Sequence, residues 1–165
     1  MVKHRVFFSF HYDKDNWRTS QVRNIGKING SSVLSDNDWE DVRKKSSTHI
    51  KRWINRQMST CSCLVVLIGS QTSSREWVKY EIEKAYKLKK GIVGIRIHKL
   101  KDQKGKQSRR GRNPFYSILN EDRKRLSNFI TVYDSHFSSS IRVYQDIEEN
   151  MEQLIEKAIV DRKKY

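Results

Sequence analysis

The chain has 165 residues, a length that suits one domain with a real hydrophobic core, and we expect a single domain over residues 1–165. One proline and seven glycines are too few for a disordered chain or for two domains joined by a linker. The formal net charge of +15, from 34 Lys and Arg against 19 Asp and Glu, would attract nucleic acid, anionic lipid headgroups or phosphate-bearing small molecules.

Targeting and redox signals point to the cytoplasm. No apolar run approaches the length that spans a bilayer, and the first residues, MVKHRVFFSF, lack the cleavage site of a signal peptide. We therefore expect a soluble cytoplasmic protein without a membrane partner. Cys61 and Cys63 are separated by one residue and have no His or Cys partners at zinc spacing, so we expect reduced thiols and no metal site.

The first third of the chain predicts two strands and two helices. A strand is expected over Arg5–Phe10, and Asp13 or Asp15 can cap a helix from about Asn16 to Ile25. The segment SSVLSD (31–36) can form a short second strand, and NDWEDVRKKSS (37–47) is polar and loop-like. A helix over Ser47–Ser59 follows, with apolar residues on one side.

The centre of the chain is the unbroken apolar run from Leu64 to Ile68. Apolar runs without alternation are typical of a strand buried on both faces, as in a parallel sheet covered by helices. After a Ser/Thr-rich turn, a helix follows whose apolar stripe packs on that sheet. Glu81 lies beside the stripe, one turn after Trp77, and we expect it to be half-buried. Such an acid is either paired with a neighbouring Lys or Arg in a structural salt bridge or is a working acid.

The second half continues the alternation of strand and helix. It predicts a strand over Gly91–His98, a short helix from Pro114 through Leu119, a strand over Asn128–Tyr133 and a long helix over Ile141–Arg162. The basic segment Lys101–Arg112 is expected to be a solvated, peripheral loop. It has no aromatic residue that could stack on a base, which argues against nucleic acid as a partner.

Alternating strands and helices favour an α/β fold with a parallel sheet, right-handed crossovers and helices on both faces. Five strands fit the flavodoxin-like three-layer sandwich with strand order 2-1-3-4-5, whose switch point lies between the first and third strands. The loops Ser9–Tyr12 and Gly69–Thr72 are therefore expected to line a pocket.

The sequence lacks the residues that several other functions of this fold require. A phospho-receiver needs acidic residues directly after the first strand, where this chain has Ser9, Phe10 and His11. A flavodoxin needs a glycine-rich phosphate loop there, and the segment FSFHYD has no glycine. The chain has no GxGxxG, Walker or GxSxG motif. What remains is a pocket with hydroxyls, a histidine, aromatic rings and one acid. Such a set suits glycosidic-bond cleavage, in which a carboxylate stabilises an oxocarbenium-like transition state.

Three segments, RVFFSFHYD, VLSDNDWED and LIGSQTSSREWVKYEI, resemble a TIR-like domain of the kind found in the signalling subunit of the bacterial Thoeris antiphage system. The most specific part is the spacing of Ser73, Trp77 and Glu81, which resembles the pattern that carries the catalytic glutamate in NAD-cleaving TIR domains. The resemblance implies that Glu81 is the catalytic acid. Together with the switch-point loops, it suggests these substrate-binding residues: Ser9, Phe10, His11, Asp36, Asn37, Ser70 and Trp77.

The function implied by the resemblance is cleavage of NAD, as a substrate and without a bound cofactor, to a cyclic or modified ADP-ribose messenger. The messenger would act in trans on a separate effector protein, and a phage-derived trigger and a homo-oligomer remain open. A noncatalytic TIR-like interaction scaffold is the main alternative, with Glu81 as a structural acid. Two further alternatives are a basic nucleic-acid-binding protein and a nucleoside deoxyribosyltransferase-like enzyme.

Overall fold

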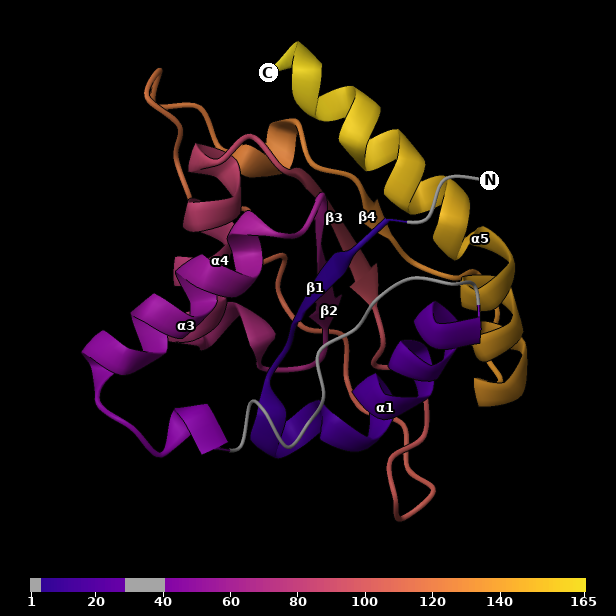
Figure 1. Ribbon diagram of the computed structural model, residues 1–165. Helices are drawn as coiled ribbons and strands as arrows, with labels where there is room; N and C mark the ends of the chain where they lie inside the picture. Colours follow the sequence, from indigo (N-terminus) through magenta and orange to yellow (C-terminus); the bar gives the residue numbers. More distant parts are fainter. Residues whose placement is uncertain (1–3, 29–40) are drawn as a thin grey trace.

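The structure is a computed structural model that describes residues 4–28 and 41–165. Within them, four parallel strands form one sheet in the order β1-β2-β3-β4. The strands are β1 (Val6–Ser9), β2 (Cys63–Ile68), β3 (Gly91–Arg96) and β4 (Val132–Tyr133). The sheet is flanked by the helices α1 (Tyr12–Ile28), α3 (Ser47–Ser59), α4 (Glu76–Lys87) and α5 (Ser140–Asp161) (Figure 1).

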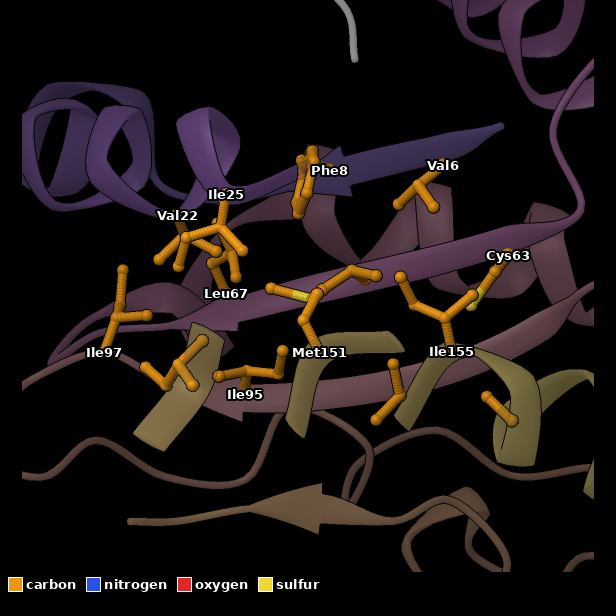
Figure 2. Packing of buried hydrophobic residues seen from close by; sticks show 14 of the residues in the cluster. Val6, Phe8, Val22, Ile25, Cys63, Leu67, Ile95, Ile97, Met151 and Ile155 are labelled. Atoms are coloured by element: carbon orange, nitrogen blue, oxygen red, sulfur yellow. The ribbon is translucent and has the colours of Figure 1, made fainter. Parts of the chain in front are cut away.

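Helices cover both faces of the sheet, as the alternation of strand and helix predicted. Because successive side chains of a strand point to opposite faces, Val6 and Phe8 pack with α1 and α5, whereas Phe7 packs with α3 and α4. Figure 2 shows the first of these two cores, where Met151 and Ile155 of α5 lie against the strands. The prediction that β2 is buried on both faces is confirmed, since all six of its residues are buried.

The described strands keep the relative order that the five-stranded prediction gave them. The second predicted strand, at 31–36, lies outside the described residues, so five strands in the order 2-1-3-4-5 remain a prediction. The helix predicted over Ser47–Ser59 has these same bounds in the structure, with the Ser46 hydroxyl accepting a hydrogen bond from the His49 N–H.

The prediction for the start of the first helix was wrong. The helix begins at Tyr12, and the Asp15 N–H donates to the His11 carbonyl oxygen at 2.9 Å, so neither Asp13 nor Asp15 caps it. The Asp15 carboxylate is instead buried and paired with the Arg18 guanidinium at 3.1 Å. A charge taken out of water needs such a partner.

Three short segments also differ from prediction. The last strand is limited to Val132–Tyr133, and the residues Leu126–Asn128 form a 3-10 helix, because Leu126 and Ile130 point into the core beside the sheet rather than along a ladder. Residues 114–117 form turns rather than a helix. Residues 41–43, expected as loop, are helical.

The basic loop Lys101–Arg112 is anchored, although its cationic side chains are mostly exposed as predicted. The buried Arg18 donates to the carbonyl oxygens of Leu100 and Lys106, at 2.7 and 2.9 Å. At the other end, Arg96 donates to the Gly111 carbonyl oxygen at 2.6 Å. The loop backbone is therefore fixed against α1 and β3. The sequence had predicted a peripheral loop and had not predicted this anchoring.

Gly94 in β3 leaves room for a side chain from the connection between β3 and β4. A methyl group at Gly94 would lie 2.8 Å from Ile68 Cδ1 and 2.9 Å from Phe115 Cε2, and both of these side chains are fully buried. We expect Gly94→Ala to lower the free energy of unfolding by about 1–3 kcal/mol, because overpacking forces neighbours off their rotamers. Urea unfolding measures it, and Gly105→Asn is the control, since Gly105 has φ +75° and no atom within 4 Å of an added Cβ. Equal stability of Gly94→Ala and wild type would contradict the packing described.

No helix in the described part of the chain is long and apolar enough to cross a membrane.

Candidate active site

Glu81 lies on α4, the helix that follows the central strand. The turn between them is fixed by Thr72, whose hydroxyl accepts a hydrogen bond from the Gly69 N–H at 2.8 Å, and α4 then begins at Glu76. Val78 and Ile82 bury the apolar stripe of α4 against the sheet. The side chain of Glu81 is 4% exposed, so it is fully buried rather than half-buried as the sequence suggested.

The Glu81 carboxyl group meets the carboxyl end of β1. The Ser9 hydroxyl donates to Glu81 Oε1 at 3.0 Å, and both residues are buried. In the part of the chain that the structure describes, no Lys or Arg pairs with Glu81, so the expected structural salt bridge is not found there. Burial raises the pKa of Glu81 to about 8, and the bond from Ser9 offsets only part of this. While it is buried, the group is mostly uncharged at neutral pH.

A cavity of about 380 Å³ lies beside this pair; we call it the α4 cavity. It is formed by the loop after β1, by Arg43 and by the start of α4. Its lining residues are Phe10, His11, Tyr12, Asp13, Arg43, Ser74, Arg75, Glu76, Trp77 and Val78. Glu81 and Ser9 do not line it, but each is close in sequence to residues that do. Phe10 follows Ser9 in the chain and Val78 precedes Glu81 by three residues on α4, which places the pair next to the lining of the α4 cavity.

The structure brings together some of the predicted site residues and not others. Phe10, His11 and Trp77 line the α4 cavity, and their role in binding remains a prediction. Ser70 does not line it: a methyl group built at Gly111 would lie 2.1 Å from the Gly69 carbonyl oxygen, so the basic loop packs directly on the turn that holds Ser70. Asp36 and Asn37 lie outside the described residues.

Tyr12 lines the α4 cavity, as the prediction for the loop Ser9–Tyr12 gave, whereas sequence reasoning missed its charged lining residues Asp13, Arg43, Arg75 and Glu76. Arg43 pairs with Asp13 at 2.9 Å and lies over the Tyr12 ring, 4.5 Å from its centroid. Arg75 has no ion-pair partner within the residues that the structure describes. Arg75 stands within the SSREW segment, two residues before Trp77, which was a usable signal.

The charged side chains of the α4 cavity are balanced in number, with Arg43 and Arg75 against Asp13 and Glu76. Burial and the positive charge of Arg75 lower the pKa of His11, so its ring is neutral at pH 7 and able to accept or donate one hydrogen bond. Arg43 is already paired with Asp13, so within the described residues Arg75 is the lining guanidinium that remains for a phosphate group. The aromatic rings are suited to a flat heterocycle. A phosphate-bearing ligand with a planar ring fits this set of side chains.

The parallel sheet, its two helical layers and a buried acid beside a cavity at the carboxyl ends of the strands define an α/β domain with a candidate active site. The sequence model of the Thoeris protein ThsB, TIR-like domain, matches residues 7–102, which include Ser9 and Glu81. The chain belongs to this TIR-like domain family.

The proteins that are similar to the chain include a curated relative and a solved structure. A protein of Bacillus cereus (strain MSX-D12) named "Putative cyclic ADP-D-ribose synthase ThsB1" is 45% identical over 116 residues, which are 67% of this chain and 60% of that protein. The chain therefore matches less than two thirds of the length of this relative. The solved structure of the Clostridium botulinum CMP N-glycosidase BcmB matches with a TM-score of 0.52 and 12% identity, over 90% of this chain and 98% of that one. This second likeness is one of fold.

Proposed function

We propose that the protein is an NAD-cleaving TIR-like enzyme that makes a cyclic or modified ADP-ribose signal in antiphage defence. The family of the chain and the name of its Bacillus cereus relative support this function. The observation in the structure that carries it is the buried Glu81, held by Ser9 beside a cavity lined by aromatic rings, two arginines and two acids. The proposal also includes the second strand at 31–36, which would complete the flavodoxin-like order.

In this proposal, the bond between C1 of the ribose and the nicotinamide nitrogen breaks. The nicotinamide leaves with the bonding electron pair and departs neutral, so no general acid is needed. The ionised Glu81 carboxylate accepts hydrogen bonds from the ribose hydroxyls and stabilises the positive charge left on the ribosyl group. An internal nucleophile of the ADP-ribose, or a water molecule that gives up a proton, then forms a bond to C1 of the ribosyl cation. Ser9, Phe10, His11 and Trp77 would bind NAD, together with Asp36, Asn37 and Ser70.

The burial of Glu81 imposes a condition on this mechanism. A neutral carboxyl group that substrate cannot reach does not stabilise a cation, so the side chains over Glu81 must move when NAD binds or when a trigger acts. Contact with water would return the pKa of Glu81 from about 8 towards its ordinary value of 4.5, and the group would ionise. At neutral pH, exposure of Glu81 to water would therefore also ionise its carboxyl group.

The test is incubation of the purified chain with NAD, at pH 7 and above pH 8, alone and in lysate from phage-infected cells that express it. Mass spectrometry then measures nicotinamide and the isomers of ADP-ribose. We expect both products, with more turnover above pH 8 in the isolated protein because Glu81 is then ionised. Absence of nicotinamide in every setting would overturn the proposal. A parallel incubation with CMP and free nucleosides separates NAD cleavage from a nucleoside-directed activity.

A noncatalytic TIR-like scaffold is a second candidate, and the burial of Glu81 is the observation that favours it. A neutral acid bonded to Ser9 is a satisfied core residue. In cells, a scaffold with Glu81→Gln would still protect against phage, whereas the enzyme would not. The enzyme proposal, by contrast, also includes an effector protein that acts in trans, a phage-derived trigger and a homo-oligomer.

A further inference from the structure

A second cavity, of about 470 Å³, lies between the turn after β2 and the end of the basic loop. It is lined by Ser73, Arg112, Asn113, Tyr116 and Ser117 and shares no residue with the α4 cavity. Ser73 and Ser74 are chain neighbours that line different cavities. We call the second one the Tyr116 cavity. Its volume falls within the range of small-molecule sites.

The polar groups of the Tyr116 cavity are mostly hydrogen-bond donors. Arg112 has no ion-pair partner, and Ser73 and Ser117 no side-chain hydrogen bond, within the residues that the structure describes. Asn113 uses Oδ1 to accept the Phe115 N–H at 2.9 Å, so its Nδ2 remains to donate. None of the five lining residues is acidic. A guanidinium with converging hydroxyl and amide donors is suited to a phosphate group.

Tyr116 supplies a flat surface in the same cavity. Tyr116 is 57% exposed, so its ring is accessible from solvent. The Arg125 guanidinium lies 3.8 Å from the ring centroid, and Arg125 Nη1 also donates to the Tyr116 carbonyl oxygen at 2.9 Å. A cation held on one face of the ring fixes its orientation and leaves the ring to stack with a planar group such as a base.

The backbone that carries Arg112 and Asn113 is fixed on both sides. Before them, the Gly111 carbonyl oxygen accepts a hydrogen bond from Arg96. After them, Phe115 is fully buried against Gly94, and its carbonyl oxygen accepts the Ser127 N–H at 3.2 Å. A ligand would therefore meet donors that are already in place, and binding would cost little conformational entropy.

We propose that the Tyr116 cavity binds a nucleoside phosphate, with the phosphate on Arg112, Ser73 and Ser117 and the base on the Tyr116 ring. This site is separate from the α4 cavity, and the inference does not rest on NAD cleavage.

The test is calorimetric titration of the full chain at low salt with AMP, adenosine and inorganic phosphate. We expect saturable binding of AMP, tighter than that of either fragment. Arg112→Gln should weaken AMP binding about 10-fold or more, since it removes the charge-assisted bonds. Tyr116→Leu should weaken AMP and adenosine by a similar factor and leave phosphate unchanged, whereas Tyr116→Phe should keep AMP binding.

Two matched variants make the result specific. Arg109→Gln and Lys104→Gln each remove an exposed cation of the same loop that lines neither cavity. Both should leave AMP binding within about twofold of wild type. Three results would overturn the proposal: no saturable AMP binding, equal losses with Arg109→Gln and Arg112→Gln, or AMP binding that Tyr116→Leu leaves intact. Melting by circular dichroism verifies that each variant is folded.

Discussion

Replacing Glu81 by glutamine is expected to lower the rate of nicotinamide release by a factor of about 100 or more. Glutamine has the same size, and its amide oxygen can still accept the hydrogen bond from Ser9. It cannot carry the negative charge that stabilises the ribosyl cation. Turnover is measured as nicotinamide released from NAD, under the condition in which the wild-type chain is active.

The control for this prediction is Glu83→Gln, which makes the same substitution on the same helix. Glu83 is half-buried and lines neither cavity, so its turnover should be close to that of wild type. A cooperative unfolding transition in Glu81→Gln excludes loss of structure as the cause. Wild-type turnover in a folded Glu81→Gln chain would contradict a catalytic role and favour the scaffold.

Local patterns in the sequence were sufficient for much of the fold. The unbroken run in β2 predicts a strand with both faces covered, because no solvent-facing position interrupts it. The stripe on α4 is likewise a local property, and it identified the helix and the position of Glu81 beside its buried face. These features depend on residues within one or two turns of each other.

The features that the sequence did not predict depend on distant segments. The anchoring of the basic loop requires Arg18 to meet the Leu100 carbonyl oxygen, 82 residues away. Full burial of Glu81 depends on its meeting Ser9, 72 residues away. A pattern within one helix shows which side of the helix faces the sheet, and it does not show how closely another strand end approaches. The sequence therefore predicted the candidate acid, and its environment came from the structure.

The α4 cavity illustrates the same limit. Phe10 and His11 were predicted from the end of the first strand, since the carboxyl ends of parallel strands meet at one edge. Arg43 belongs to a segment that read as loop, and nothing in its local sequence indicates that it packs on Tyr12. Its place depends on a contact with Asp13, 30 residues away in the sequence.

The buried carboxyl group also predicts an unusual dependence of stability on pH. The folded chain keeps the Glu81 proton up to about pH 8, whereas the unfolded chain loses it near pH 4.5. Between these values the folded state holds more protons, so the contribution of Glu81 to the free energy of unfolding falls as pH rises. The shift corresponds to a loss on the order of 3–5 kcal/mol. Glutamine has no proton to lose, so Glu81→Gln should match wild type near pH 5 and be more stable by a few kcal/mol near pH 8.

The measurement is urea unfolding of wild type and Glu81→Gln from pH 5 to pH 8.5. The difference between the two curves is the quantity to use, because His11 and His98 act in the opposite direction: burial lowers the pKa of each, so their contribution grows as pH rises. A difference that grows with pH would place the Glu81 carboxyl in a buried environment in solution. Parallel curves would mean that water already reaches Glu81 in the isolated chain, so no uncovering step would have to precede NAD cleavage.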